Sequence, residues 1–366
     1  MSVCQVGSAW GCLHREEAMF VQNPNTNRYR CLSILLAGMM AVTSLPLPAF
    51  AADAAAGEEI AISAERFPDE QFRNYISEQL DSDGDNMLSA TECSEVVDLN
   101  VSQQGIADLT GIDVFSKLQQ LDCSGNTLSA LDISGAAQLL QLNCSANPDL
   151  SALKLPEKNG AFSFLVMLDC SDCALTELSL DSYALLGTLD CSGNQLAALD
   201  ISANSNLRTV DCSGNQLTTL DVSANSNLQT VNCSNNQLTT LNFSQNAKLE
   251  EVDCSGNQLT ELDVYNALLQ KLDCSENALP SLFLSECSAL RELDCSQNQL
   301  VELDTTGLTL EILETAGNQR AIVPQPEQAG AYSYDLNNLP ELEQDRITGW
   351  ENASVKEDAA NVLQIP

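Results

Sequence analysis

The sequence has almost no histidine: its 366 residues include only His14. Ser-His-Asp and Cys-His mechanisms and histidine-containing zinc sites all need this residue, so none of them is available after residue 14. A pair of carboxylates, as in glycosidases, remains possible on residue types alone. The aspartates here belong to repeated columns, however, whereas an active site needs one pair with differing environments. The sequence therefore predicts a protein that is not an enzyme.

Basic residues are also scarce. Lysine and arginine total 15 against 51 aspartates and glutamates, which gives a formal net charge of -36. Nucleic acid and anionic membrane surfaces would repel such a chain, so we expect neither as a partner. Metal ions, cationic patches and neutral surfaces remain possible. Long polar tracts do not alternate with charge blocks, so the acidity is that of a folded surface and not of a disordered tail.

Long apolar runs are missing except near the start. Arg28 and Arg30 precede an apolar run over residues 31–42, and the small-x-small sequence Ala49-Phe50-Ala51 follows. This order is typical of a secretory signal peptide. A membrane anchor is the alternative, but it needs about 20 apolar residues, and this run is interrupted by Ser, Gly and Pro. We predict a leader and signal peptide over residues 1–51, with Met19 as an alternative start. The mature protein is expected to be soluble, not inserted in a membrane, and secreted or at the cell surface.

What the chain does have is a repeat. The segment Leu-Asp-Cys-Ser-Gly-Asn recurs with small changes, and the cysteines of successive copies are separated by 21, 26, 21, 21, 21, 21, 20 and 21 residues. A fixed period in the twenties indicates a solenoid, in which each coil buries its apolar face against its neighbours. The cysteines that mark the copies are Cys123, Cys144, Cys170, Cys191, Cys212, Cys233, Cys254, Cys274 and Cys295.

Each position of the repeat has a physical reason. In Leu-Asp-Cys the side chains alternate in, out and in, as a short strand requires. The asparagine that follows tolerates a turn and can satisfy buried backbone groups, so we expect stacked asparagines to form a hydrogen-bonded ladder. The second half of each unit echoes the first and has no helical spacing. We therefore expect short strands on both sides of the coil. The ladder asparagines are Asn126, Asn147, Asn194, Asn215, Asn236, Asn257, Asn277 and Asn298.

Cysteines are frequent for an exported chain. Of 15, three lie in the leader and nine occupy one repeat position beside inward leucines. Disulfides are one interpretation of such a count. Their place in the repeat favours the other, in which reduced cysteines stack in the core as small apolar side chains. Cys170 and Cys173 have the CxxC spacing of redox and metal sites. Cys173 stands where other copies have asparagine, which favours a structural substitution.

The repeat resembles the leucine-rich repeat, whose signature LxxLxLxxNxL is matched at Leu118, Leu121, Cys123, Asn126 and Leu128. The resemblance implies a leucine-rich-repeat solenoid of mostly parallel strands with little helix. About eleven coils fit within residues 96–320. The repeat is also similar to those of exported bacterial proteins that are broadly like internalins. This resemblance implies a protein or glycan partner on the strand-lined face.

A second motif precedes the repeats. Residues 81–92 fit the twelve-residue EF-hand calcium loop, with Asn86 in place of the usual glycine. A merely acidic turn is the alternative. We expect a structural Ca²⁺ as cofactor, inside a helical N-terminal cap over residues 52–95 that resembles the caps of exported bacterial leucine-rich-repeat proteins. The predicted ligands are Asp81, Asp83, Asp85, the Met87 carbonyl, Ser89 and both oxygens of Glu92.

The outward aspartates of the strands should stack in one column. Local hydrogen bonds from the serine two residues later are one explanation for them. A surface that binds cations or a basic partner is the other. The candidate binding residues are Asp169, Asp190, Asp211, Asp253, Asp273 and Asp294, with Asp122 in the same column. A second column contains Asp132, Asp200, Asp221, Asp263 and Asp304.

The repeat is interrupted around residues 148–164, where an insertion carries Lys154 and Lys158. Two interpretations of this insertion remain open: sequence drift that the solenoid tolerates, and a loop that contacts a ligand. Residues 321–366 are expected to form a linker and a C-terminal cap or partial β module. They lack an LPxTG-type sorting signal. Secretion without an anchor and a truncated gene are both consistent with this end.

Two functions remain on these residues. The first is a binding module that presents its acidic repeat surface to a protein or glycan. The second is a structural component of the cell envelope that self-associates or binds wall polymer. A binder should show exposed aromatic side chains, but Phe243, Tyr183, Tyr265 and Phe283 are scattered over nearly uniform coils.

Overall fold

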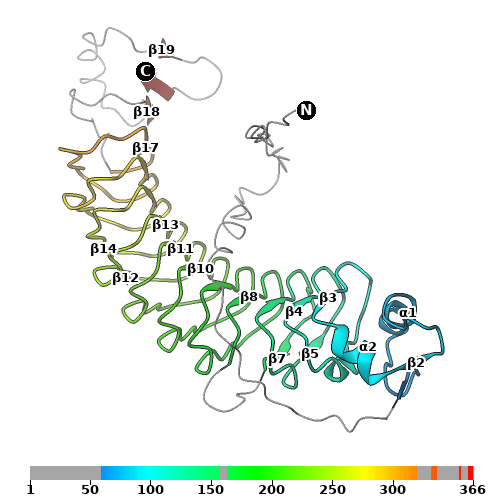
Figure 1. Ribbon diagram of the computed structural model, residues 1–366. Coiled ribbons are helices and arrows are strands. Elements are labelled where there is room, and N and C mark those ends of the chain that lie inside the picture. Colours follow the sequence, from blue (N-terminus) through cyan, green and yellow to red (C-terminus); the bar gives the residue numbers. More distant parts are fainter. Residues whose placement is uncertain (1–58, 157–162, 320–330, 336–353, 356–361, 366) are drawn as a thin grey trace, which may run out of the picture. The chain divides into compact units, whose positions relative to one another are not determined.

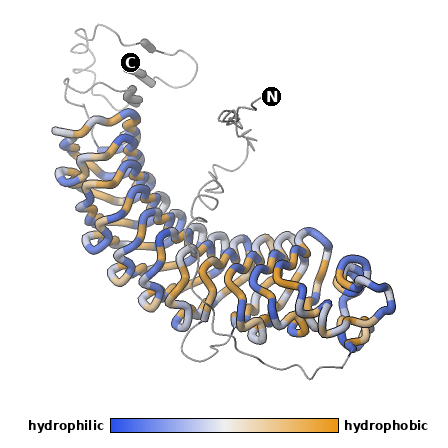
Figure 2. Tube along the Cα trace, in the orientation of Figure 1, coloured by the Kyte–Doolittle hydropathy of each residue, from blue (hydrophilic) through white to orange (hydrophobic). Residues whose placement is uncertain are grey.

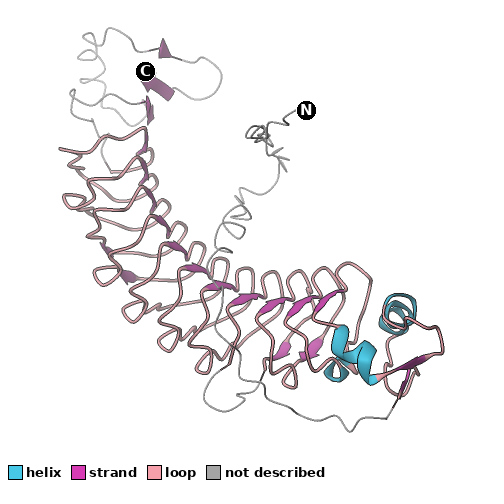
Figure 3. Cartoon of the chain, in the orientation of Figure 1, coloured by secondary structure: helices cyan, strands magenta, loops and turns pink. Residues whose placement is uncertain are grey.

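A computed structural model describes residues 59–156, 163–319, 331–335, 354–355 and 362–365. The predicted leader and signal peptide and Lys158 of the insertion lie outside these residues. Along the described repeats the chain winds in coils, and strands follow one side of the array (Figures 1 and 3). The predicted solenoid of short parallel strands with little helix is confirmed.

The main sheet takes one three-residue strand from each coil. Neighbouring strands are parallel and in register, so that Val210 pairs with Leu189 on one side and with Val231 on the other. Equivalent residues of successive repeats therefore stack. The strands are β3 (Asp98–Asn100), β4 (Gln120–Asp122), β6 (Gln141–Asn143), β8 (Met167–Asp169), β9 (Thr188–Asp190), β10 (Thr209–Asp211), β11 (Thr230–Asn232), β13 (Glu251–Asp253), β15 (Lys271–Asp273), β16 (Glu292–Asp294) and β17 (Ile312–Glu314).

The second half of the coils forms strands only in places. In the described coils there are two parallel pairs, β5 (Ala130–Asp132) with β7 (Ala152–Lys154), and β12 (Thr240–Asn242) with β14 (Glu261–Asp263). The prediction of strands on both sides is thus only partly confirmed. Side chains replace the missing ladder between these pairs, where the Asn204 amide donates to the Leu180 carbonyl and the Asn225 amide to the Ile201 carbonyl.

The core runs through the middle of the coils. Leu189, Cys191 and Leu196 of one coil are fully buried, as are their counterparts in neighbouring coils. Figure 2 shows the resulting regular exchange of hydrophobic and hydrophilic positions along the chain. Burying a leucine side chain contributes roughly 1.5–3 kcal/mol. One coil cannot bury its own face, so each depends on the coils beside it.

The N-terminal cap contains two helices and a small two-stranded sheet. Helix α1 (Glu70–Gln79) begins at Asp69, whose side chain accepts a hydrogen bond from the Phe72 backbone N–H at 2.9 Å. Helix α2 (Ala90–Glu95) begins at Ser89, which forms the predicted capping box with Glu92. Strands β1 (Ile60–Ala61) and β2 (Met87–Leu88) pair antiparallel.

The cap is fixed to the first coil by specific contacts. The second carboxylate oxygen of Asp69 accepts a hydrogen bond from the Ala107 N–H at 2.8 Å. Arg66 forms an ion pair with Asp113 of the 3₁₀ turn η2 (Ile112–Val114) at 2.7 Å. Gly111 has a φ of 102°, and a Cβ there would lie 2.4 Å from the Phe67 ring. Only glycine permits this approach of the cap to the coil.

Beyond the repeats the sheet continues. Strand β18 (Ala331–Asp335) pairs parallel with β17, and β20 (Val362–Ile365) pairs antiparallel with β18 and with β19 (Ser354–Val355). The linker proposed within residues 321–366 lies largely outside the described residues. Among the helices of the described residues, none has the length and apolar character needed to cross a membrane.

Candidate functional site

The outward aspartates form the predicted column, here called the sheet-side column. In-register pairing sets Asp190 beside Asp169 on one side and beside Asp211 on the other. Asn143 and Asn232 occupy the same register and divide the carboxylates into shorter runs. In chain order the column is Asn100, Asp122, Asn143, Asp169, Asp190, Asp211, Asn232, Asp253, Asp273, Asp294 and Glu314.

Local hydrogen bonds hold these carboxylates in place. One oxygen of Asp190 accepts from the Ser192 backbone N–H at 3.0 Å and from the Ser192 hydroxyl at 2.7 Å. This confirms that the serine two residues later serves each aspartate, as the first of the two explanations required. Both of these bonds reach Oδ1 of Asp190. The same pair of bonds occurs at Asp122, Asp169, Asp211, Asp253 and Asp273.

Negative charge is unfavourable in the sheet-side column, because its carboxylates are stacked and partly buried. Carboxylates about 5 Å apart repel by roughly 0.8 kcal/mol even in water, and by more beside a low-dielectric interior. Burial, followed by the charges of Asp211 and Asp169, raises the pKa of Asp190 to about 7. Burial likewise raises the pKa of Asp253 and of Asp294. A positively charged group placed against this surface would relieve the repulsion.

One neutral member of the column shows how neighbouring coils can interact. The Asn232 amide donates a hydrogen bond to Oδ2 of Asp211 at 2.9 Å. The two residues lie on adjacent strands, β11 and β10, in the same register. A donor at this position therefore reaches the carboxylate of the preceding coil.

The second column differs in its surroundings. Asp132 pairs with Lys154 of the next coil at 2.8 Å, and both side chains are exposed. The Lys154 hydrogen bond, and then those from Ser134, lower the pKa of Asp132 to about 2. Asp200 is exposed, and hydrogen bonds from Ser202 lower its pKa. The hydrogen bonds thus favour the anionic forms of Asp132 and Asp200, whereas burial disfavours the anionic forms of Asp190, Asp253 and Asp294.

Exposed apolar side chains are few in the described coils. Phe283 takes a second-column position and has 67% of its surface exposed, and Tyr265 is 50% exposed. Phe243 and Tyr183 are buried and belong to the core. Of the four scattered aromatic residues in the coils, only Phe283 and Tyr265 are therefore exposed enough to contact a partner.

The asparagine ladder is present as predicted. Oδ1 of Asn215 accepts from the Leu196 N–H at 2.9 Å, and its amide donates to the Cys191 and Cys212 carbonyls at 3.0 and 3.1 Å. Each such residue thus closes its own turn and binds the coil before it. Cys173 takes this place in its repeat, where its thiol contacts the Cys144 carbonyl at 3.4 Å, which confirms the structural interpretation.

A second asparagine ladder, which was not predicted from the sequence, lies in the other half of the coils. The fully buried amide of Asn225 donates to the Ile201 carbonyl at 2.9 Å and to the Asn204 carbonyl at 3.0 Å. Asn246 repeats the pattern one coil later. The recurring Ala-Asn-Ser-Asn was the available signal. Cys287 continues this ladder, with its thiol 3.6 Å from the Val264 carbonyl.

The cysteines provide packing and no evident reactivity. All 12 cysteines in the described residues are buried and free of disulfides. Burial raises the pKa of Cys191 and of Cys233 well above the ordinary thiol value. Since the thiolate is the reactive form, these side chains are poor nucleophiles and poor metal ligands.

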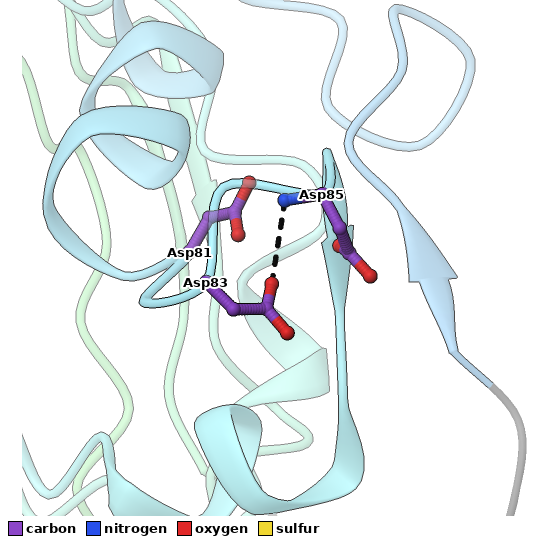
Figure 4. A group of neighbouring side chains, drawn as sticks. All are labelled: Asp81, Asp83 and Asp85. Atoms are coloured by element: carbon purple, nitrogen blue, oxygen red, sulfur yellow. Dashed lines mark hydrogen bonds between the residues drawn. The ribbon is translucent and has the colours of Figure 1, made fainter.

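The acidic loop of the cap gathers three carboxylates. Oxygens of Asp81, Asp83 and Asp85 lie within 4.8 Å of one another, and Figure 4 shows the three side chains around the turn. Asp81 accepts backbone hydrogen bonds from Gly84 and Asn86 at 2.8 and 2.9 Å. Asn86 has a φ of 65°, the left-handed turn expected at the sixth loop position.

The last loop position behaves differently. One oxygen of Glu92 accepts from the backbone and hydroxyl of Ser82 at 2.7 Å, and the other accepts from those of Ser89 at 2.8 Å. Hydrogen bonds from Ser89 and Ser82 lower the pKa of Glu92 to about 2. Glu92 is not part of the aspartate cluster. The roles of Met87, Ser89 and Glu92 as ligands stay predictions.

Comparisons with known proteins bear on the repeats. A family model described as leucine-rich repeats (two copies) matches residues 226–267. The functional domain of InlJ from Listeria monocytogenes, described as including a cysteine ladder, is 31% identical with a TM-score of 0.56. The alignment covers 72% of this chain and 62% of that structure. This chain therefore spans less than two thirds of the InlJ domain.

Two other structures are more distant. YopM from Yersinia pestis, described as a leucine-rich effector protein, is 20% identical with a TM-score of 0.51, and the alignment covers 70% of this chain and 72% of YopM. The internalin InlF from Listeria monocytogenes is 18% identical with a TM-score of 0.45, over 75% of this chain and 98% of InlF. No curated protein matches the sequence. The coils, their buried cysteine column and the family match together identify the chain as a leucine-rich-repeat solenoid similar to InlJ.

Proposed function

We propose that this protein is a binding module that is secreted or displayed at the cell surface. Its sheet-side column contacts a protein or glycan partner that brings positive charge to the carboxylates. The observation that carries the proposal is the in-register row of half-buried aspartates, of which Asp190, Asp253 and Asp294 have raised pKa values. An extended solenoid surface suits recognition of a macromolecule. Its repeated carboxylates do not make the single divergent pair that catalysis needs.

We also propose that the cap loop binds a structural Ca²⁺. Asp81, Asp83 and Asp85 supply clustered carboxylate oxygens, the hard ligands that this ion prefers. The left-handed Asn86 gives the loop its expected turn. Glu92 would complete the site by exchanging its hydrogen bonds with Ser82 for the ion. The ion would then join the end of α1 to the start of α2 and stiffen the cap.

A pull-down tests the binding proposal. Calcium-loaded mature protein is immobilised and exposed separately to host-cell extract and to cell-wall extract, beside beads that carry no protein. We expect a discrete partner that is eluted by salt, because the contact is electrostatic. Retention of wall polymer alone would favour the structural envelope component. The absence of any retained molecule would contradict both functions.

A further inference from the structure

A small apolar patch lies on the second half of two neighbouring coils. It consists of Tyr265, Leu268 and Phe283, each with half or more of its surface exposed. Tyr265 and Leu268 follow β14, which Figure 1 shows on the side of the coils away from β13. Phe283 belongs to the next coil. Single exposed apolar side chains are ordinary, whereas several on adjoining coils indicate a surface that contacts a partner.

The repeat register brings the two aromatic side chains to the same side. The Cys287 thiol contacts the Val264 carbonyl at 3.6 Å, in the place where asparagines of the second ladder reach the preceding coil. This alignment places Phe283 beside Asp263. Val264 is buried, so the residues on either side of it, Asp263 and Tyr265, point outward. Tyr265 and Phe283 are therefore diagonal neighbours across one step of the solenoid.

The fold does not require apolar side chains at these three positions. Each position is polar in an adjacent coil, and a polar residue there can bond locally, as Asp304 does with the Thr306 N–H at 2.9 Å. Core packing does not explain the replacements, because the three side chains are exposed. The residues that correspond to Tyr265, Leu268 and Phe283 in an adjacent coil are Ser244, Lys248 and Asp304.

The surface around the patch is acidic and has no basic group. The second halves of its two coils and of the following coil, residues 259–269, 279–289 and 300–308, contain no lysine or arginine. They contain five carboxylates, of which four are exposed and one is half-buried. A partner that covers the apolar side chains therefore meets negative charge beside them. The carboxylates are Glu261, Asp263, Glu286, Glu302 and Asp304.

We propose that this patch docks a basic peptide segment of another protein. The apolar side chains of the segment cover Tyr265, Leu268 and Phe283, and its lysines or arginines meet the surrounding carboxylates. The exposed aromatic faces attract the same cations. A second copy of this chain would bring like charge to the patch, and a neutral glycan would leave the carboxylates without a counter-charge. This surface lies on the other half of the coils from the sheet-side column and serves a separate partner.

Two synthetic peptides of equal charge test the proposal. One alternates lysine with leucine and the other alternates lysine with serine, and the Kd of each for the full chain is measured by fluorescence anisotropy at physiological ionic strength. Charge alone would give the two peptides the same Kd. We expect the lysine–leucine peptide to bind at least about tenfold more tightly, because it alone buries apolar surface against the patch.

Variants that restore repeat residues locate the contact. The test variant carries Tyr265→Ser and Phe283→Asp, and its control is Leu185→Asn, which replaces an exposed leucine of a distant coil by the residue that the following coil has at Asn206. The control should keep the preference for the lysine–leucine peptide and the test variant should lose it. Phe283→Asp adds negative charge, so binding through charge alone would become tighter. Leu268→Asn, with both aromatics intact, should also weaken the preference.

Two results would overturn the proposal. The first is an equal Kd of the two peptides for the parent chain. The second is a folded test variant, with a Tm like that of the control, that binds the lysine–leucine peptide as tightly as the parent or more tightly. A neutral N-acetylglucosamine oligomer is measured in parallel. If it binds the parent and not the test variant, while neither peptide distinguishes the two, the patch is a glycan site and the proposal is wrong.

Discussion

At the scale of single residues, the asparagines hold one coil to the next. Asn215 is almost fully buried and joins Leu196, Cys191 and Cys212 through its side chain. No other side chain of that size supplies both a donor and an acceptor at this turn. The repeat keeps a polar residue in its core because backbone groups there have no other partner.

Replacing Asn215 by alanine should strand these backbone groups. We expect a loss of about 1–3 kcal/mol in the free energy of unfolding for each buried group that is left unsatisfied, measured by urea denaturation. Asn227→Ala is the control, because Asn227 is only partly buried, donates to the Ser205 carbonyl at 3.0 Å and accepts from the Lys248 side chain at 2.7 Å, so that no buried backbone group is stranded. Equal effects of the two substitutions would show that the buried ladder has no special role.

The first ladder could be predicted because a polar residue interrupts an apolar pattern at a fixed interval. The second could not, since Ala-Asn-Ser-Asn offers two asparagines in a polar segment. Only the structure shows that Asn225 points into the core while Asn227 lies outside. The raised pKa of Asp190 could not be predicted from the sequence either, because it depends on how deeply the column is buried.

At the scale of elements, the cap loop joins α1 to α2. Its helices, its left-handed Asn86 and the capping box of Ser89 and Glu92 were all predictable from local spacing. The bonds between Glu92 and Ser82 were not. Ser82 stands at a loop position that supplies no metal ligand, so the motif gives no reason to expect it beside Glu92.

Calcium should raise the Tm of the protein. An ion that binds only the folded state at 100 times its Kd adds about 2.7 kcal/mol. Asp83→Ala should abolish this gain with little change in the metal-free protein, because Asp83 is exposed and its one backbone bond, to Asp85, is long at 3.3 Å. Asp108→Ala removes a half-buried aspartate outside the loop, which accepts hydrogen bonds only from Thr110, and should keep the gain. Coincident melting curves with calcium and with chelator would rule the site out.

At the scale of the whole molecule, acidity opposes folding. The chain carries a formal net charge of -36, and its repeats stack like charges in two columns. Stacking is forced by the period, so the columns themselves could be predicted from the sequence. Their different chemistry could not, because it arises from burial on one side and from Lys154 and solvent on the other.

Salt should therefore stabilise this protein. The Debye length falls from about 30 Å at 10 mM to about 8 Å at 150 mM ionic strength, which screens repulsion between coils. We expect the Tm to rise over that range of sodium chloride, as measured by calorimetry in the presence of chelator. A Tm that falls with salt would mean that ion pairs such as Lys154 with Asp132 outweigh the repulsion.

The most direct test of the account compares the two columns in binding. One variant carries Asp253→Asn, Asp273→Asn and Asp294→Asn in the sheet-side column. The matched control carries Asp200→Asn, Asp221→Asn and Asp263→Asn in the second column, so that both lose three charges.

The quantity to measure is the Kd of the partner recovered by pull-down. We expect the sheet-side variant to bind at least about tenfold more weakly than the parent, a loss of about 1.4 kcal/mol in binding free energy, while the control binds like the parent. Equal Kd values for the two variants would contradict it.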